Sequence, residues 1–114
     1  MSRLESRNAP HARAALFAAL GDETRLALVG KLAGGEPQSI ARLTEGSILT
    51  RQAISKHLRV LEDAGIVRGV RAGRESRFAF QPEPFKELGA YLEQVSSQWD
   101  EALKRLKSFV EKDG

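Results

Sequence analysis

The chain has 114 residues, of which 41% are apolar and 29% charged, and its net charge is +3. These values are typical of one soluble globular domain. The absence of cysteine excludes a disulfide framework, a thiolate metal site, a thiol redox sensor and a cysteine nucleophile. No apolar run approaches the roughly 18 residues of a membrane span, and the N-terminal segment has no apolar stretch. We therefore expect a cytoplasmic protein with no membrane segment and no signal peptide.

The positive charge is concentrated in one part of the chain. Residues 51–77 carry seven basic and three acidic side chains, a net charge of +4, while the rest of the chain carries −1. This distribution favours a polyanionic partner. Charge alone leaves a solvated basic face without a partner equally open.

The N-terminal part of the chain predicts a tail and two helices. Residues 1–10 are predicted to be a flexible tail. Pro10 suits the start of a first helix, which is expected to end at Gly21. Asp22 lies where an N-cap belongs, so a second helix is expected from there to the glycine pair at 34–35.

The next segment predicts a helix–turn–helix. A short helix over 38–43 is followed by a turn and by a longer helix over 50–64, with Thr50 as its N-cap and Gly65 at its end. The longer helix has an inward apolar stripe at spacings of four and three, formed by Ile54, Leu58 and Leu61.

The outward face of the longer helix carries the residue types that read a major groove. Glutamine bonds adenine, arginine bonds guanine and serine bonds several base edges, while lysine and arginine also neutralise phosphates. The N-terminal part of a recognition helix reaches the bases. We predict base contacts by Arg51, Gln52 and Ser55, and phosphate or base contacts by Lys56 and Arg59, with Thr50 touching a phosphate. The alternative is an amphipathic core helix with a polar outer face.

The following segment predicts a basic hairpin. Strands are expected over 66–71 and 75–80, joined by a tight connection that contains Gly73. A hairpin directly after a recognition helix is typical of a wing that contacts the DNA backbone or minor groove. The predicted wing contacts are Arg71, Arg74 and Arg77. A plain solvated hairpin is the alternative.

The last helix is expected to begin at Pro82 and to carry an apolar seam at alternating spacings of three and four. A helix of about 28 residues would be about 42 Å long, more than a small domain needs for its own core. The seam therefore indicates a second chain; a helix that only wraps its own domain, or a small-molecule pocket around Trp99, remains open. Residues 11–81 are the predicted core and 82–114 its dimerisation helix. The predicted interface comprises Leu16, Leu88, Leu92, Val95, Trp99 and Leu106.

Three runs together resemble the ArsR family of small winged-helix repressors. They are ALGDETRL at 19–26, TRQAISKHLRVLEDAGIV at 50–67 and GRESRF at 73–78. The resemblance covers about residues 12–110. It implies a homodimeric, DNA-binding transcriptional regulator whose first and last helices form the dimer interface.

The sequence departs from that family in two places. The connection at 44–49 is a few residues longer than usual, which leaves the start of the recognition helix open. Metal-sensing members carry cysteines on the short helix, or histidine with acidic residues on the last helix, and this chain has neither set. We therefore predict no metal and no cofactor. His57 is expected to have a structural role, bonded to backbone or phosphate, and His11 to be solvated.

The combined prediction is a mainly α fold with a small β-hairpin, a homodimeric winged helix–turn–helix that binds double-stranded DNA. It is expected to repress transcription from a palindromic operator. No P-loop, nucleophile elbow or dinucleotide-binding glycine motif is present, so no enzyme and no catalytic residue is predicted. Two alternatives stay open: a winged helix that binds a protein partner, and a sensor of an unknown small-molecule effector.

Overall fold

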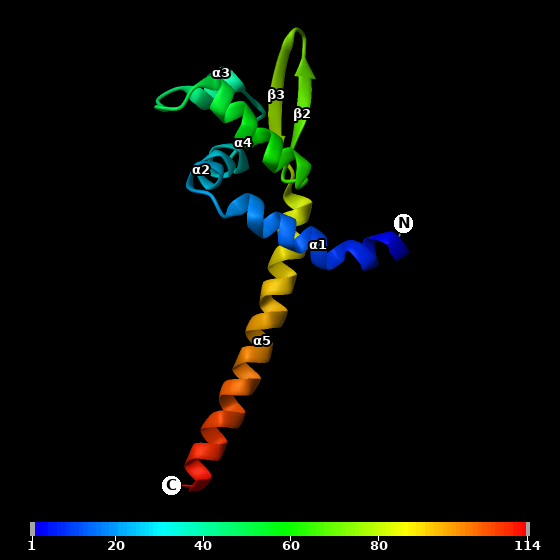
Figure 1. The fold of residues 1–114 in the computed structure, drawn as a ribbon, viewed down its shortest axis with the longest axis vertical. Helices are drawn as coiled ribbons and strands as arrows, with labels where there is room; N and C mark the ends of the chain where they lie inside the picture. The colour runs from blue at the N-terminus through cyan, green and yellow to red at the C-terminus, as the bar shows by residue number, and fades with distance from the viewer. Residues whose placement is uncertain (1, 114) are drawn as a thin grey trace. The chain divides into compact units, whose positions relative to one another are not determined.

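The computed structural model describes the backbone of residues 2–113 and the side chains of residues 11–112. It divides into two compact units, Met1–Pro84 and Phe85–Gly114. In chain order the elements are α1 (Ser2–Leu20), α2 (Glu23–Ala33), β1 (Gln38–Ser39), α3 (Ile40–Thr44), α4 (Arg51–Asp63), β2 (Val67–Ala72), β3 (Glu75–Phe80) and α5 (Pro82–Asp113) (Figure 1). This order confirms the predicted mainly α fold with a winged helix–turn–helix.

Helix α1 begins earlier than the sequence predicted. It starts at Ser2, so residues 2–10 are helical rather than a tail, and Pro10 lies inside the helix instead of opening it. The segment before Pro10 contains the strong helix formers Arg3, Leu4, Glu5, Arg7 and Ala9. Proline inside a helix removes one hydrogen bond and its ring clashes with the carbonyl four residues earlier, so Pro10 destabilises the helix that runs through it.

The segment before α3 also differs from the prediction. Gln38 and Ser39 form the short strand β1 instead of the start of a helix, and they pair antiparallel with Phe78 and Arg77 of β3. The Ser39 hydroxyl accepts a hydrogen bond from the backbone N–H of Arg42 at 3.1 Å. An N-cap residue needs extended backbone, which Ser39 has, and extended backbone can also pair with a strand.

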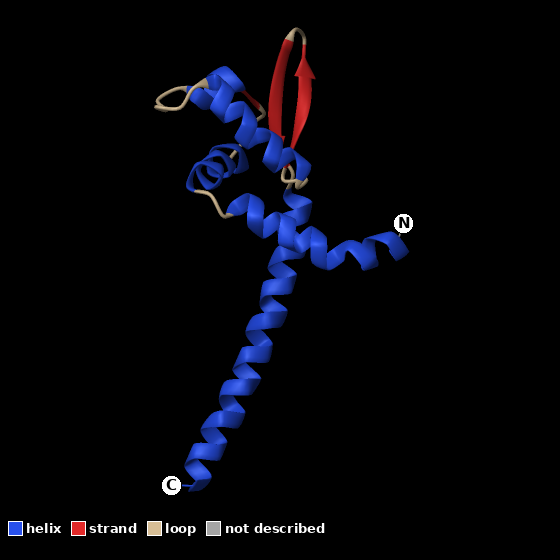
Figure 2. Cartoon of the chain, viewed as in Figure 1, coloured by secondary structure: helices blue, strands red, loops and turns tan. Residues whose placement is uncertain are grey.

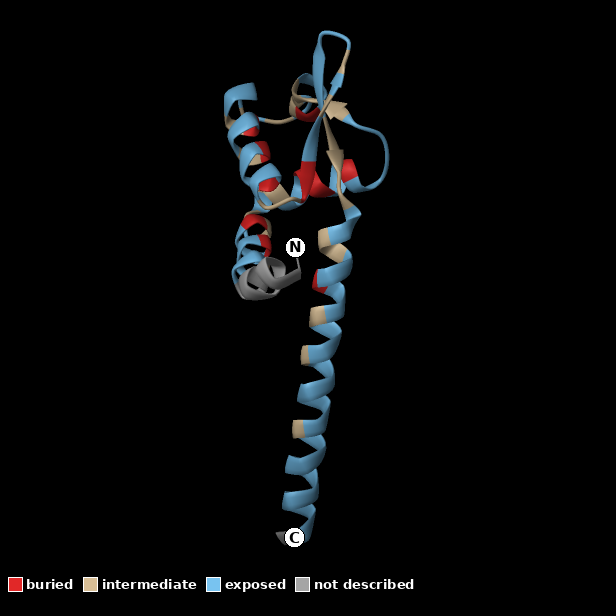
Figure 3. Ribbon diagram, turned by 90° about the vertical axis from the view of Figure 1, so that its right-hand side faces the viewer, coloured by how far each residue is buried: buried red, intermediate tan, exposed pale blue. Residues whose placement is uncertain are grey.

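The core of the first unit lies among α2, α3, α4 and the base of the hairpin. Leu32, Leu43, Leu58 and Leu61 have no exposed surface, and Ile54 is 2% exposed. Figure 3 shows the buried residues on the inner sides of the helices and at the base of the strands. The inward stripe predicted for α4 is therefore confirmed.

The hairpin projects beyond the helices of its unit (Figure 2). The strand order is β1-β3-β2, and the ladder of the hairpin runs from Val67 opposite Phe80 to Ala72 opposite Glu75. Gly73 has a φ of +64°, whereas Arg74 has no positive φ, so the two-residue connection fits a type II′ turn. This turn matches the twist of the strands and holds the tip of the hairpin tightly.

Helix α5 has 32 residues. Over the described residues, none of the helices combines the length and the apolar character that crossing a membrane requires. The exposed apolar side chains of α5 include Trp99, which is 64% exposed, and Phe109, which is 65% exposed.

Candidate nucleic-acid interface

The start of α4 is fixed by Thr50. Its backbone is extended, and its hydroxyl accepts a hydrogen bond from the backbone N–H of Ala53 at 3.1 Å. The long connection before it therefore does not shift the helix, which begins at Arg51. The unpaired N–H groups of a first helical turn and the helix dipole together favour an anion such as a phosphate. The Thr50 hydroxyl can still donate its own proton, because it acts only as an acceptor in the cap.

The predicted DNA-binding residues of α4 share one surface. They recur at spacings of one and three, which places them on one side of a helix, opposite the buried stripe. All of them are exposed, as is Thr50. The surface thus brings together Arg51, Gln52, Ser55, Lys56 and Arg59. We name this surface the α4 stripe.

The wing arginines do not share one face. Arg71 lies opposite Ser76 in the ladder, whereas Arg77 lies opposite Val70, and directly paired residues point to the same side of a sheet. Arg71 and Arg77 therefore point to opposite faces, and Arg74 lies at the tip. The Arg77 Nε donates a hydrogen bond to Oε1 of Glu75 at 2.7 Å, which offsets part of its charge.

Arg68 has a position on the hairpin similar to that of Arg77, although it is not among the predicted wing residues. Arg68 is exposed and lies on the same face of the hairpin as Arg77, because it pairs with Ala79. The strict alternation of a strand was the signal that could have assigned it to that face. The side of the wing that carries Arg68 thus has two arginines, of which one is paired with an acid.

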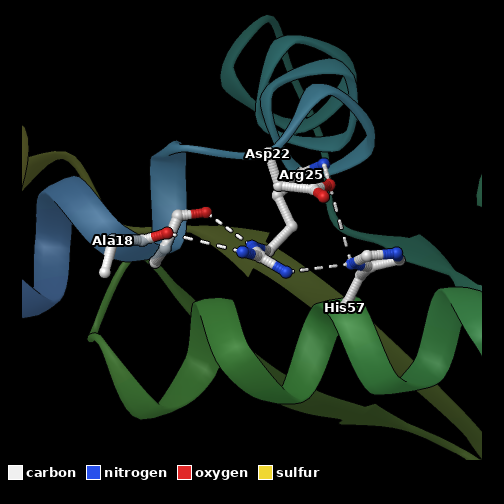
Figure 4. A network of polar contacts seen from close by, with 5 residues as sticks. Ala18, Asp22, Arg25 and His57 are labelled. Carbon is white, nitrogen blue, oxygen red and sulfur yellow. Dashed lines mark hydrogen bonds and ion pairs between the residues drawn. The ribbon is translucent and has the colours of Figure 1, made fainter.

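His57 joins α4 to the start of α2 through side chains (Figure 4). Its Nδ1 lies 3.2 Å from Nη1 of Arg25, whose Nε donates to the backbone carbonyl of Ala19 at 2.6 Å. Arginine can only donate, so the Nδ1 of His57 accepts and the ring proton of the neutral form lies on Nε2. Within the chain, the partner of His57 is thus a side chain 32 positions away and not a backbone group.

Asp22 completes this contact between elements. Its Oδ2 accepts the backbone N–H of Arg25 at 3.0 Å, as expected of an N-cap, and lies 3.8 Å from Nδ1 of His57. The hydrogen bond from the backbone of Arg25, aided by the charge of that side chain, holds the pKa of the Asp22 carboxyl below its ordinary value.

This lowered pKa predicts an acid-dependent loss of stability. A carboxyl whose pKa is lower in the folded chain stabilises the fold above its unfolded pKa, about 4, and loses that contribution as the pH falls through the folded value. Asp22→Asn keeps an N-cap side chain but has no charge to titrate. We expect the free energy of unfolding in urea to fall more between pH 6 and pH 3 for the native chain than for the variant. Equal losses in the two chains would contradict a stabilising role for the Asp22 charge.

The predicted interface residues differ in accessibility. Leu16 and Leu88 are only 6% exposed. That these two residues face a partner chain stays a prediction. Leu92, Trp99 and Leu106 are 48%, 64% and 58% exposed, and Val95 is half-buried. The sequence pattern alone does not give the exposed fraction of each residue in the seam.

The described side chains contain no group of three His, Asp or Glu residues placed to hold a metal ion. His57 instead has Arg25 as a neighbour on one side and Asp22 on the other.

Comparison with known proteins agrees with this geometry. The family described as "Helix-turn-helix domain" matches residues 12–70, which include α2, α3 and α4. An uncharacterised HTH-type transcriptional regulator of Bacillus subtilis, YuzN, is 42% identical over 80 residues, which are 65% of this chain and 87% of the relative.

The solved structures most similar to this chain include further transcriptional regulators with a helix-turn-helix. An ArsR-like transcriptional regulator from Rhodococcus sp. RHA1 superposes with a TM-score of 0.79 at 34% identity, over 89% of this chain and 94% of that one. The homodimeric winged helix-turn-helix DNA-binding domain of Mb0332 from Mycobacterium bovis has the same fold, with a TM-score of 0.62 at 19% identity over 89% and 90% of the two chains. The chain therefore belongs to the ArsR-like helix-turn-helix transcriptional regulators and is a DNA-binding protein.

Proposed function

We propose that the protein is a cytoplasmic homodimer that represses transcription by binding a palindromic operator. The observation that carries this proposal is the α4 stripe, an exposed row of arginine, lysine, glutamine and serine on a helix whose start is fixed by a cap. The resemblance to small winged-helix repressors supports repression over activation of transcription.

In the proposed complex, α4 enters the major groove. Arg51, Gln52 and Ser55 lie in its first two turns, where a recognition helix meets base edges. Lys56 and Arg59 follow and neutralise phosphates, while the exposed arginines of the hairpin grip the flanking backbone. Two chains related by a two-fold axis read two half-sites, so the operator is an imperfect palindrome.

The homodimer is supported by the exposed apolar side chains of α5, since exposed apolar patches mark interaction sites. The homodimeric state of the Mycobacterium bovis relative agrees with it. Burying this surface would also help a chain of 114 residues, whose own core is small for its surface.

The decisive experiment selects bound sequences from random DNA and then measures affinity for the selected site at several salt concentrations. We expect a palindromic consensus and a steep loss of affinity with salt, because each phosphate contact contributes about 0.9 to the log–log slope. Failure to bind any DNA would overturn the proposal and favour a winged helix that binds a protein partner.

The tip of the wing gives a second test. Arg74→Ala should weaken binding to specific and random DNA by a similar factor and lower the salt slope by about one for each chain, because a phosphate contact carries no sequence information. Lys104→Ala, which removes a positive charge from α5, is the matched control and should change neither quantity. A loss confined to the specific site would show that Arg74 reads bases instead.

A further inference from the structure

The connection between α3 and α4 is a hydrogen-bonded turn. Glu45 has a φ of −55° and a ψ of 130°, and Gly46 has a φ of +76°, values that fit a type II β-turn over residues 44–47. The backbone N–H of Ser47 closes this turn by donating to the carbonyl of residue 44 at 3.0 Å. The Ser47 hydroxyl accepts a second hydrogen bond, from the backbone N–H two residues later, at 3.0 Å. The backbone is therefore held on both sides of residue 48.

Ile48 follows this turn with a fully exposed side chain. Its exposed fraction is 101%, whereas the other exposed large apolar side chains of residues 11–112 are between 40% and 65% exposed. Figure 2 shows the connection as a loop that extends beyond the two helices that it joins. Ile48 buries no apolar surface in the single chain, so the stability of the fold does not explain an apolar side chain at this position.

Ile48 lies close to the end of α4 that is proposed to read bases. It precedes the N-cap Thr50 by two residues and Arg51 by three. Three residues span at most about 11 Å, and successive base pairs are about 3.4 Å apart. In the proposed complex, Ile48 is therefore within about three base pairs of the one that Arg51 contacts.

The chemistry of the connection favours a base over a phosphate as the partner of Ile48. Residues 45–50 carry no basic side chain, and Glu45 is acidic. The side chain of Ile48 has no hydrogen-bond donor or acceptor, so only an apolar group can be its partner. The major groove presents one such group, the C5-methyl of thymine, which apolar side chains contact in protein–DNA complexes.

We propose that Ile48 reads a thymine in each half-site through the C5-methyl group of that base. This inference rests on the proposed function and adds an apolar determinant to the hydrogen bonds from α4. Burying one methyl-sized group changes affinity about fourfold. The connection thereby extends the recognised sequence beyond the bases that α4 contacts.

Deoxyuridine provides a direct test, because it pairs like thymidine and lacks only the C5-methyl group. Each thymine of the selected operator is replaced in turn, at the equivalent position of both half-sites, and affinity is measured by titration. We expect one position at which the native chain loses about fourfold for each half-site, or about 15-fold for the two together. An operator in which no thymine is sensitive to this replacement would overturn the inference.

Two variants assign the effect to Ile48. Ile48→Ser should bind the thymine operator at least fourfold more weakly for each half-site and should no longer distinguish thymine from uracil at the sensitive position. Ile48→Leu is the matched control, because it keeps the apolar surface and should keep the preference for thymine. Neither change should alter the free energy of unfolding much, because the side chain is fully exposed.

The remaining outcomes separate this inference from the proposed function. A preference for thymine that persists in Ile48→Ser would overturn the inference, because another residue then contacts the methyl group. An equal loss of affinity for random DNA in that variant would also overturn it, in favour of a contact with the sugar–phosphate backbone. A native chain that binds no DNA at all would instead overturn the proposed function.

Discussion

Replacing Trp99 by aspartate is expected to convert the proposed dimer into monomers and to weaken operator binding about a hundredfold or more. Trp99 is 64% exposed in the single chain, so its loss should leave the fold of each chain intact. In a dimer the same position is covered, and a buried carboxylate without a partner is strongly destabilising. Joining two half-site readers raises affinity by about 10² to 10⁴, and monomers lose that gain.

The measurement combines light scattering with a binding titration on a two-half-site operator and on a single half-site. Ser97→Asp is the matched control, because it adds the same charge to an exposed position of α5 outside the apolar seam. We expect the control to remain dimeric and the Trp99 variant to bind both DNAs with similar, low affinity. A Trp99→Asp chain that stays dimeric at micromolar concentration would show that the interface lies elsewhere.

The sequence predicted best where local chemistry and periodicity agree. The stripe of Ile54, Leu58 and Leu61 alone defines which side of α4 is buried, and therefore which polar residues remain outside. Asp22 and Thr50 fix the starts of two helices through hydrogen bonds from residues only three positions later. A short sequence pattern is enough to predict such local bonds. For the same reason the α4 stripe could be listed from the sequence residue by residue.

What the sequence missed depends on partners far along the chain. The strand β1 exists because Gln38 and Ser39 meet β3 about forty positions later, and two residues carry too little pattern to signal a strand. The bond between Arg25 and His57 spans 32 positions.

In the wing, too, the sequence predicts which residues are present, and only the strand pairing shows which face each one occupies. Its arginines were predictable as a group, but only the ladder assigns Arg71 and Arg77 to opposite faces and places Glu75 beside Arg77. Arg71 and Arg77 can both contact DNA only if the hairpin presents both of its faces to it. Of the predicted wing residues, Arg74 at the tip is therefore the one whose access to DNA does not depend on which face is used.

Replacing Gln52 by alanine is expected to remove most of the sequence preference at one base pair of each half-site. A bidentate bond from glutamine to adenine contributes roughly 1–3 kcal/mol of discrimination, which is about 5- to 150-fold in relative affinity. Gln52 is exposed in the second position of α4, and alanine is the best helix former, so the free energy of unfolding should change little. The loss would therefore report on recognition and not on folding.

The measurement is competition between the selected operator and variants of it that differ at single base pairs. Gln94→Ala is the matched control, because it removes the same side chain from an exposed position of α5. The control should keep the full preference, and affinity for random DNA should be nearly equal in all three chains, since phosphate contacts remain. If Gln52→Ala instead weakens specific and random DNA alike, Gln52 contacts the backbone, and the reading of bases falls to Arg51 and Ser55.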